Sequence, residues 1–318
     1  TKIKDGHLVE VCKLEFECLH AVVEMELKGI LLNKEAWAIL HEKYLKEQQE
    51  LSTKLLEELG QGVVQMNFFG EEKTFGINLD SHQQVIKAFK SKGIDLESTS
   101  HYELMEYKDK SELVEWFMEY RKVTKAIHSF LSPLPQYINS ATGRLHPSYY
   151  QLGAHSGRFS CGNPNIQQIP RGKEFRDCFI PAKGNKLVIA DYSQIELRVA
   201  AEIAEDTTMM AAYRQNMDLH ALTASLVANK PIEMITKQER QAAKAVNFGL
   251  IYAMGAKGLQ GYAKTVYGVD LSLKEAELFR SRFFGAYKGI AKWHERMKKA
   301  ADIRECRTLS GRRVLFRE

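Results

Sequence analysis

The chain has 318 residues, of which 44% are hydrophobic and 27% are charged. This mixture is typical of a globular protein with two or three domains. No apolar run reaches the ~18 residues that span a bilayer, and the N-terminal residues lack the apolar core of a signal peptide. We therefore expect a soluble, intracellular protein with no membrane partner. The five cysteines form no CxxC pair and no zinc spacing, and their odd number argues against a disulfide framework.

The net charge of +5 averages over segments of opposite sign. An acidic stretch flanked by basic ones suits a polyanion held around a metal ion, and a solvated surface of mixed charge is the alternative. Counting Lys and Arg against Asp and Glu, residues 1–120 carry 14 against 23, residues 121–186 carry 10 against 2, residues 187–229 carry 2 against 6, and residues 291–318 carry 9 against 4.

The N-terminal part of the chain is predicted to be helical. Apolar residues recur at helical spacing from Leu14 to Leu59, with a short turn between two helices around Gly29 and Asn33. The second of these helices reads as a long amphipathic rod that ends at Gly60.

The next elements are shorter. Residues 63–81 are predicted to form a loop interrupted by glycines, and Ser81 to cap a short helix. A further helix is predicted over residues 110–130. Prolines and a glycine follow it, so we place a domain boundary near residue 131.

The C-terminal part alternates strand and helix signals. Residues 185–193, "NKLVIADYS", are predicted to form a buried strand with Asp191 at its carboxyl end, and residues 194–206 to turn helical. Thr236 stands three residues before Glu239, which is the capping-box pattern, so a helix is predicted from about residue 237 to 254. Residues 305–318 predict a β-hairpin that turns at Ser310 and Gly311.

The helix predicted after Thr236 carries a regular set of four residues. Arg240, Lys244, Phe248 and Tyr252 are spaced by four, so they lie along one helix face. The two cations stand near the helix N-terminus, which favours anions such as a triphosphate, and the two aromatic rings could stack on any base. An ordinary amphipathic helix is the alternative.

Asp191 allows two interpretations. An aspartate at a strand end often caps the following helix. It could instead be a metal ligand for chemistry on phosphates, but two-metal catalysis needs acidic residues that hold two cations ~3.5 to 4 Å apart. A single carboxylate cannot hold two such ions.

Two segments give a resemblance to a known family. "DYSQIELR" and "RQAAKAVNFGLIY" resemble motifs A and B of family A DNA polymerases, the bacterial DNA polymerase I family, in the right order and about 50 residues apart. "GRFSCGNPNIQQIP" is similar to the family's segment that touches the primer-template, "TLSGRR" to a late hairpin, and residues 120–151 to the junction of thumb and palm. The resemblance extends from about Lys13 to the end of the chain.

The resemblance implies an α+β fold of the right-hand polymerase type, with a helical thumb, a partial antiparallel-sheet palm and helical fingers. The implied boundaries are 1–32 for a helical segment leading into the palm, 33–130 for the thumb, 131–206 for the palm part with motif A, 207–290 for the fingers with the motif B helix, and 291–318 for a hairpin returning toward the palm.

The resemblance also implies a catalytic site. Asp191 and the backbone carbonyl of Tyr192 would hold two Mg²⁺ ions. Arg240 and Lys244 would bind the triphosphate of an incoming deoxynucleotide and support catalysis, with His220 assisting. A hydrogen-bonded helix histidine is the alternative for His220.

The remaining nucleotide contacts follow from the same motifs. Glu196 would lie under the sugar, exclude a 2′-hydroxyl and hydrogen-bond Tyr252, which would stack near the templating position and swing as the helix closes. Phe248 would pack on the incoming sugar and base, and Gln194 belongs to the same site. Ala253 stands where the family commonly has glycine, and we expect the alanine to stiffen the hinge after Tyr252.

Primer-template DNA is the implied macromolecular partner. Gln168 replaces the family's usual asparagine. The residues expected to contact DNA are Arg158, Asn165, Gln168, Arg171 and Arg312.

The family's second metal-binding aspartate lies in an "HDE"-type turn beyond motif B, and neither "HD" nor "DE" occurs in this sequence. We therefore expect a C-terminal polymerase fragment, either a separate polypeptide or the continuation of this one, to supply that aspartate. We expect the chain alone to be inactive and to contain no proofreading exonuclease domain.

The implied function is template-directed DNA synthesis in the cytoplasm of a bacterial or phage-infected cell, or in an organelle. A catalytically silent nucleic-acid-binding subunit that retains the polymerase motifs is the alternative. A single-subunit RNA polymerase shares the general plan, but Glu196 and Phe248 argue against it.

Overall fold

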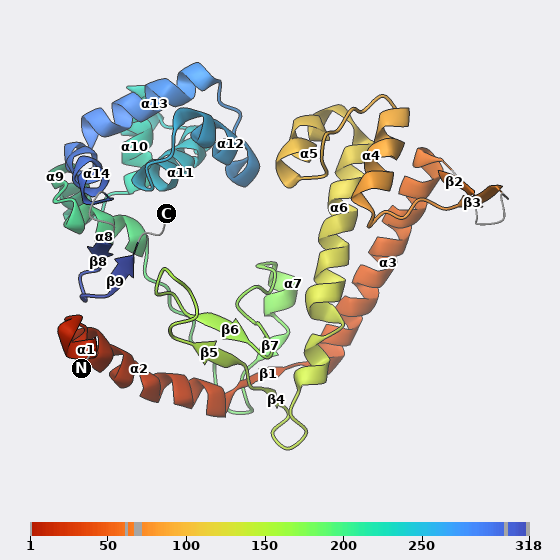
Figure 1. Cartoon of the computed structure of the whole chain (residues 1–318), viewed down its shortest axis with the longest axis horizontal. Coiled ribbons are helices and arrows are strands. Elements are labelled where there is room, and N and C mark those ends of the chain that lie inside the picture. The colour runs from red at the N-terminus through yellow and green to blue at the C-terminus, as the bar shows by residue number, and fades with distance from the viewer. Residues whose placement is uncertain (1, 61–62, 67–71, 302–304, 316–318) are drawn as a thin grey trace. The chain divides into compact units, whose positions relative to one another are not determined.

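The computed structural model describes residues 2–60, 63–66, 72–301 and 305–315 (Figure 1). The chain forms two compact units, which we call unit 1 (residues 1–189 with 308–312) and unit 2 (residues 190–307 with 313–318). Within the described ranges, no helix combines the length and the apolar character that crossing a bilayer requires.

Unit 1 is built on two long helices that pack against each other, α3 (Lys34–Leu59) and α6 (Glu112–Ala126) (Figure 1). α3 begins after Asn33, whose side chain accepts a hydrogen bond from the Ala36 N–H at 3.0 Å, and it ends at Gly60, where φ is +87°. The π-helix η2 (Ile127–Leu131) continues α6. The other helices of unit 1 are α1 (Lys2–Asp5), α2 (Val9–Lys28), α4 (His82–Ser91), α5 (His101–Tyr107), η1 (Lys108–Lys110), η3 (Leu134–Tyr137) and α7 (Lys173–Arg176).

The strands of unit 1 are short and antiparallel. The first sheet places Leu31 opposite Arg144 on one side and Ile180 on the other. Its strand order is β4 (Arg144–Leu145), β1 (Ile30–Leu32), β7 (Phe179–Ile180), and the two further pairs are β2 (Val63–Met66) with β3 (Glu72–Phe75) and β5 (Ser148–Tyr150) with β6 (Ser160–Gly162).

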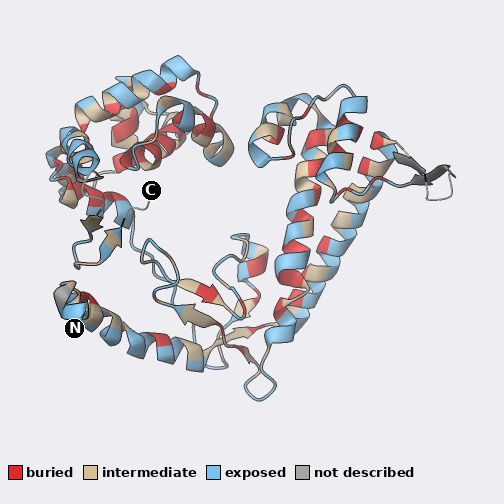
Figure 2. Ribbon diagram, viewed as in Figure 1, coloured by how far each residue is buried: buried red, intermediate tan, exposed pale blue. Residues whose placement is uncertain are grey.

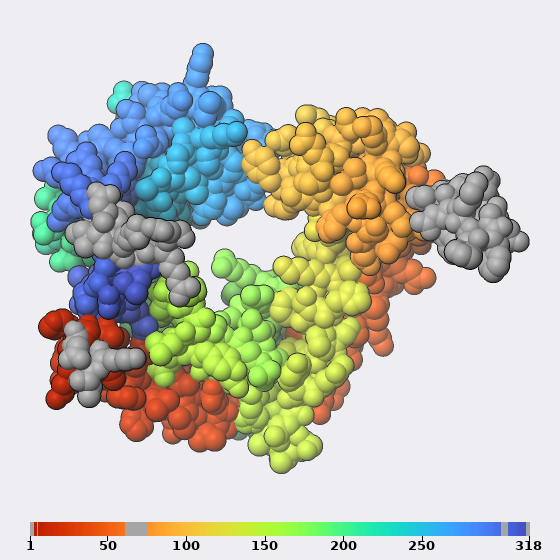
Figure 3. All heavy atoms as spheres, in the orientation of Figure 1, coloured from red at the N-terminus to blue at the C-terminus, as the bar shows by residue number. Residues whose placement is uncertain are grey.

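The described residues of unit 1 form two hydrophobic clusters, and Figure 2 shows their buried positions. The first lies where α3 and η2 meet the three-stranded sheet, and its Trp37 is 1% exposed and donates from Nε1 to the Leu131 carbonyl at 3.0 Å. The second contains Leu55 of α3, Phe89 of α4 and Phe117 of α6, and Figure 3 shows the outer surface of this region of unit 1. Each fully buried large side chain of this kind stabilises the fold by ~1.5 to 3 kcal/mol.

Unit 2 is a group of helices around α11 (Lys237–Ile251). α11 packs against α8 (Ile195–Ile203), α10 (Leu219–Ala228), α12 (Ala256–Tyr267) and α13 (Leu273–Ala286). The described part of unit 2 also contains α9 (Thr207–Arg214), η4 (Ile232–Met234), α14 (Lys288–Ala301), and the paired strands β8 (Glu305–Arg307) and β9 (Arg313–Leu315).

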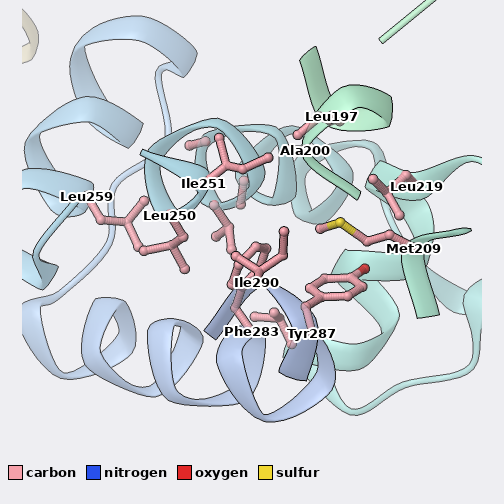
Figure 4. Close-up of a cluster of buried hydrophobic side chains, with 14 of the residues drawn as sticks. Leu197, Ala200, Met209, Leu219, Leu250, Ile251, Leu259, Phe283, Tyr287 and Ile290 are labelled. Carbon is pink, nitrogen blue, oxygen red and sulfur yellow. The ribbon is translucent and has the colours of Figure 1, made fainter. Parts of the chain in front are cut away.

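One hydrophobic cluster joins the helices of unit 2 (Figure 4). Within it, the fully buried rings of Phe283 and Tyr287 meet edge to face, with centroids 4.9 Å apart. This geometry is the one that aromatic quadrupoles favour.

Asp206 is a charged residue inside this unit and is only 1% exposed. Its Oδ1 accepts a hydrogen bond from the Met209 N–H at 3.0 Å, at the start of α9. Its Oδ2 accepts from the N–H groups of Gly289 at 2.8 Å and Ile290 at 3.3 Å, at the start of α14. One carboxylate therefore caps two helices, and these bonds satisfy amides that would otherwise lack partners.

Most of the predicted helices are confirmed. The two N-terminal helices are α2 and α3, and the capped short helix is α4. The helix predicted over residues 110–130 corresponds to α6 and η2, and the one predicted over residues 194–206 is α8. The hairpin is confirmed by β8 and β9, with Gly311 at φ +86° in the turn. The short turn predicted around Gly29 contains the three-residue strand β1.

Three local predictions are wrong. The strand predicted over residues 185–193 has no regular secondary structure, and Val188 and Ile189 are 91% and 88% exposed. An apolar run becomes a strand only when another strand pairs with its backbone, and no described strand does so here. The predicted loop at 63–81 contains β2 and β3, with residues 67–71 outside the described ones. The helix predicted to reach residue 254 ends at Ile251.

Candidate active site

The predicted face of α11 is present in unit 2. Arg240, Lys244 and Phe248 are half-buried and Tyr252 is exposed, whereas the residues on the opposite side of α11 are buried in the core. α11 begins with the predicted capping box, in which the Thr236 hydroxyl accepts from the Glu239 N–H and the Glu239 carboxylate accepts from the Thr236 N–H. The four residues spaced by four therefore share one accessible side of the helix.

Arg240 is oriented by a carboxylate that the sequence did not single out. Its Nε donates to Asp218 Oδ2 at 2.6 Å, while Asp218 Oδ1 caps α10 by accepting from the His220 N–H at 2.9 Å. Burial alone would raise the pKa of Asp218, but the hydrogen bonds from Arg240 and from backbone amides outweigh burial and lower it. Asp218 is therefore ionised at neutral pH and holds the guanidinium in place. Lys244 forms no ion pair with another described residue.

His220 lies behind this face and is 5% exposed. Its Nδ1 lies 2.9 Å from Asn247 Nδ2, and the centroids of its ring and the Phe248 ring are 5.8 Å apart. Burial, with a smaller contribution from the nearby Arg240 and Lys244, lowers the pKa of His220 to about 4 against the opposing effect of Asp218. The imidazole is therefore neutral at physiological pH. The hydrogen-bonded histidine is thus present, and a contact with phosphate stays a prediction.

The C-terminal end of α11 links to motif A. Tyr252 is 64% exposed, and its hydroxyl donates to Glu196 Oε2 at 2.9 Å, as the resemblance implied. After Tyr252 the helix stops in a Schellman motif, because the Ala253 N–H donates to Leu250 O and the Met254 N–H donates to Gly249 O, both at 3.0 Å. Ala253 occupies the left-handed region with φ +59°, which glycine usually fills at this position.

Gln194 stands just before α8 with φ +54°. The Tyr213 hydroxyl donates to its Oε1 at 3.1 Å, and the Arg198 guanidinium lies over the Tyr213 ring, 4.2 Å from the centroid. Arg198 Nε also donates to the Ser193 carbonyl at 2.9 Å. Sequence reasoning missed Tyr213 and Arg198, since the contacts of Tyr213 with Gln194 and with Arg198 depend on α8 meeting α9.

Asp191 and Tyr192 lie in the exposed segment before α8. A carboxylate and a backbone carbonyl are oxygen donors of the kind Mg²⁺ prefers, so both fit as partial ligands. In the described part of the chain, however, no three His, Cys, Asp or Glu side chains cluster closely enough to hold a metal ion. These residues alone therefore do not complete a two-cation site.

Four of the residues predicted to contact DNA lie in unit 1. Arg158, Asn165, Gln168 and Arg171 are all exposed. Asn165 and Gln168 line a hollow of about 230 Å³ beside η3. Their side chains are accessible to a ligand, and their binding to DNA stays a prediction.

Arg312 has a different environment, also in unit 1. Its Nη2 forms an ion pair with Glu15, and its side chain is 21% exposed. Glu15 Oε2 accepts a second hydrogen bond from Gln151 Nε2 at 2.8 Å. A Cβ on Gly157 would lie 2.9 Å from Arg312 Nε, so that glycine permits the close approach. In this structure Arg312 holds the segment around residues 151–157 to α2, and its contact with DNA stays a prediction.

Comparison with known proteins identifies the family. The sequence model of DNA polymerase family A matches residues 39–318. DNA polymerase I of Aquifex aeolicus is 45% identical over 220 residues, which cover 69% of this chain and 37% of the relative. The thermostable DNA polymerase I of Thermus aquaticus is 31% identical over 311 residues, which cover 93% of this chain and 36% of the relative. The chain thus spans under two fifths of the length of these two relatives.

A solved structure has the same fold. The POL domain of Pol1 from M. smegmatis, in complex with DNA primer-template and dNTP, aligns with a TM-score of 0.80 at 24% identity. The alignment covers 95% of this chain and 52% of that chain. This match confirms the predicted right-hand polymerase fold. The family model, which matches most of the sequence, shows that the chain belongs to DNA polymerase family A.

Proposed function

We propose that this chain is part of a DNA-directed DNA polymerase that adds deoxynucleotides to a primer 3′-hydroxyl. The observation that carries the proposal is the accessible face of α11, which presents Arg240, Lys244 and Phe248 and is joined to motif A by the bond from Tyr252 to Glu196. In the reaction the primer hydroxyl attacks the α-phosphate in line and pyrophosphate leaves.

The two cations would bind the triphosphate. Arg240 is already held by Asp218, so little side-chain entropy is lost when its remaining N–H groups bind phosphate. Lys244 lies one turn further along the same face and has no competing ion pair among the described residues. A cation on each of two successive turns suits a chain of phosphates, and the N-terminal end of α11 adds to their attraction.

The aromatic end of the face would receive the sugar and the base. Phe248 would pack on both, and Tyr252 would stack near the templating base. Glu196, held by the Tyr252 hydroxyl at 2.9 Å, would occupy the space that a 2′-hydroxyl needs. This arrangement supports a preference for deoxynucleotides.

Asp191 and the carbonyl of Tyr192 would hold Mg²⁺. When two Mg²⁺ ions are bound, they supply activation of the attacking hydroxyl and neutralisation of the leaving phosphates. Because Asp191 is one carboxylate, we propose that a C-terminal polymerase fragment contributes a second aspartate and that this chain alone is inactive. The exposed apolar side chains of Val188 and Ile189 support contact with a further segment, since adjacent exposed apolar residues often mark a surface that another polypeptide covers.

Primer-template DNA would bind through the exposed residues of unit 1, with Arg158 and Arg171 on phosphates and Asn165 and Gln168 near the nascent duplex. Arginine contacts to phosphate release counterions, so the affinity should fall as salt rises. Arg312 would join this set only through its exposed edge, because Glu15 holds its guanidinium.

Primer extension tests the proposal. The chain is assayed alone and together with the C-terminal fragment of a family A polymerase, and only the mixture should incorporate deoxynucleotides. Asp191→Asn should lower kcat of the mixture by ~10²-fold or more. Glu202→Gln is the matched control, because Glu202 is an exposed carboxylate on α8 and its loss should change little. Full-rate incorporation by the isolated chain would contradict the split site.

A catalytically silent nucleic-acid-binding subunit is the second candidate. The lack of a group of three metal-binding side chains among the described residues favours it. Under this function, Asp191→Asn would leave the activity of any assembly unchanged. Salt-dependent DNA binding would persist under both functions, so binding alone does not separate them.

A further inference from the structure

A row of hydrogen-bonding side chains runs through the core of unit 2, and its members Thr223, Asn247 and Tyr287 have no part in the function proposed above. Thr223 on α10 and Asn247 on α11 are both 0% exposed, as is Tyr287 at the end of α13. The row ends at His220, whose ring is 5% exposed. Buried polar groups are costly unless each is paired, so the direction of each hydrogen bond is constrained by its neighbours.

The donor and acceptor of each hydrogen bond can be assigned by starting at Asn247. Its Oδ1 can only accept, so the Thr223 hydroxyl must donate to it across 2.9 Å. With its proton used, Thr223 can only accept from the Tyr287 hydroxyl, 2.7 Å away. Burial raises the pKa of Tyr287, so this tyrosine keeps the proton it donates.

The same reasoning fixes the proton on the imidazole. Because Asn247 Oδ1 faces Thr223, its Nδ2 faces His220 Nδ1 at 2.9 Å and donates to it. Nδ1 must therefore be unprotonated, which places the proton of the neutral ring on Nε2. If the Asn247 amide were rotated, its Nδ2 would donate to the Thr223 hydroxyl, and Thr223 would have to donate to Tyr287. The Tyr287 hydroxyl would then lack an acceptor in this row.

We propose that Asn247, oriented by Thr223 and Tyr287, holds His220 in the tautomer with its proton on Nε2. The inference rests on the proposed function, in which the triphosphate binds at Arg240 and Lys244, and on the role that the family resemblance implies for His220, which would assist there. A phosphate oxygen needs a donor, and the opposite tautomer would present a lone pair. Asn247, Thr223 and Tyr287 do not reach the nucleotide themselves, so they are positioning residues.

The charges around the ring fit this arrangement. Asp218, on the same element as His220, favours the imidazolium, whereas Arg240 and Lys244 from α11 disfavour it. A neutral donor beside these two cations avoids a third positive charge at the triphosphate site. It also keeps the donor unchanged across neutral pH.

Nitrogen NMR of the full chain tests the tautomer without any nucleotide. The chain is labelled with [¹⁵N]histidine, and the His220 signals are those lost in His220→Gln. At pH 7 we expect Nε2 to resonate as a protonated nitrogen and Nδ1 as an unprotonated one. A protonated Nδ1, or exchange between the two tautomers, would overturn the inference.

A pair of variants tests the row itself. Thr223→Val keeps the shape but removes the hydroxyl, which frees the Asn247 amide to rotate, so the tautomer with the proton on Nδ1 should appear. Thr223→Ser restores a hydroxyl and should restore the wild-type spectrum. A Thr223→Val spectrum identical to wild type would mean that Thr223 only fills space. If this variant does not fold, Asn247→Asp replaces it. Its carboxylate can only accept, so it should draw a proton onto Nδ1.

Nucleotide kinetics of the assembled polymerase separate the tautomer from the function. If both are right, Thr223→Val should raise KM for deoxynucleotides by about 5-fold, the effect of one hydrogen bond, with a smaller change in kcat, and Thr223→Ser should restore KM. An altered tautomer with an unaltered KM would refute the role of His220 at the triphosphate but leave the row as described.

Discussion

Replacing Asp206 should destabilise unit 2 strongly, because one side chain serves two helices that begin 81 residues apart in sequence. In Asp206→Ala, α9 loses its N-cap, at a cost of ~1 kcal/mol. The N–H groups of Gly289 and Ile290 lose their shared acceptor, and a buried unsatisfied N–H costs about 1 to 3 kcal/mol. Removing a buried charge offsets part of this loss. We expect a net loss of about 3 kcal/mol in the free energy of opening of unit 2.

Asp206→Asn is the informative companion. An amide has one acceptor oxygen, so it can cap α9 or α14 but not both. Asparagine is about as good an N-cap as aspartate, so we expect α9 to keep its cap and α14 to lose its partner. The expected loss is about half that of the alanine variant.

Hydrogen exchange read by mass spectrometry suits this test, because a chain of two units need not unfold in one step. Peptides covering residues 207–214 and 288–301 report α9 and α14 separately. Asp206→Ala should speed exchange in both, and Asp206→Asn mainly in α14. Wild-type protection of α14 in the alanine variant would refute the double cap.

Three further outcomes are expected. Gly29→Ala should lower the stability of unit 1 by over ~3 kcal/mol in urea unfolding. The reason is that φ is +56° and the new Cβ would lie 2.4 Å from the Leu145 carbonyl oxygen. The control Gly143→Ala, at φ +68° with no atom near the new Cβ, should lower the stability by only ~1 kcal/mol. The stability of unit 2 should fall as pH drops from 6.5 toward 4, since unfolded His220 takes up a proton that the folded ring, with its pKa of about 4, does not. When hydrogen exchange of unit 2 is measured as a function of pH, the stability of His220→Gln should depend less steeply on pH over this range. A pH dependence identical to that of the wild type would refute the contribution of His220. Tyr252→Phe removes the donor to Glu196, so we expect ribonucleotide rejection by the assembled polymerase to weaken by about 5-fold in competitive incorporation, and unchanged rejection would contradict the role of that bond.

Local signals in the sequence predicted the elements that depend on local contacts. The capping box of Thr236 and Glu239 located the start of α11, and Gly60 located the end of α3, because caps involve residues three or four positions apart. The spacing of four correctly grouped Arg240 with Tyr252. The family resemblance added the bond from Tyr252 to Glu196, which spacing alone does not contain.

The features that the sequence did not predict depend on contacts between residues far apart in the chain. Asp206 caps α14 across 83 residues and Asn247 meets His220 across 27, and no sequence period reports such contacts. The run at residues 187–190 has the composition of a buried strand, but composition does not provide the strand that must pair with it. The glycines near residues 70–76 suggested a loop, although β2 and β3 form around them.

Ala253 gives the end of α11 an energetic bias. An alanine with φ +59° is less favourable by ~1 to 2 kcal/mol than one in the right-handed region, so any rearrangement that returns it to negative φ releases that energy. At 1 kcal/mol this shifts the equilibrium toward the rearranged terminus by about 5-fold relative to glycine at the same position. The substitution for glycine therefore does more than restrict rotation, because it weakens the particular helix ending that places the Tyr252 hydroxyl against Glu196. A terminus weakened in this way is suited to exchange between two positions of the Tyr252 ring. Glycine at residue 253 would stabilise the helix ending in which the Tyr252 hydroxyl contacts Glu196.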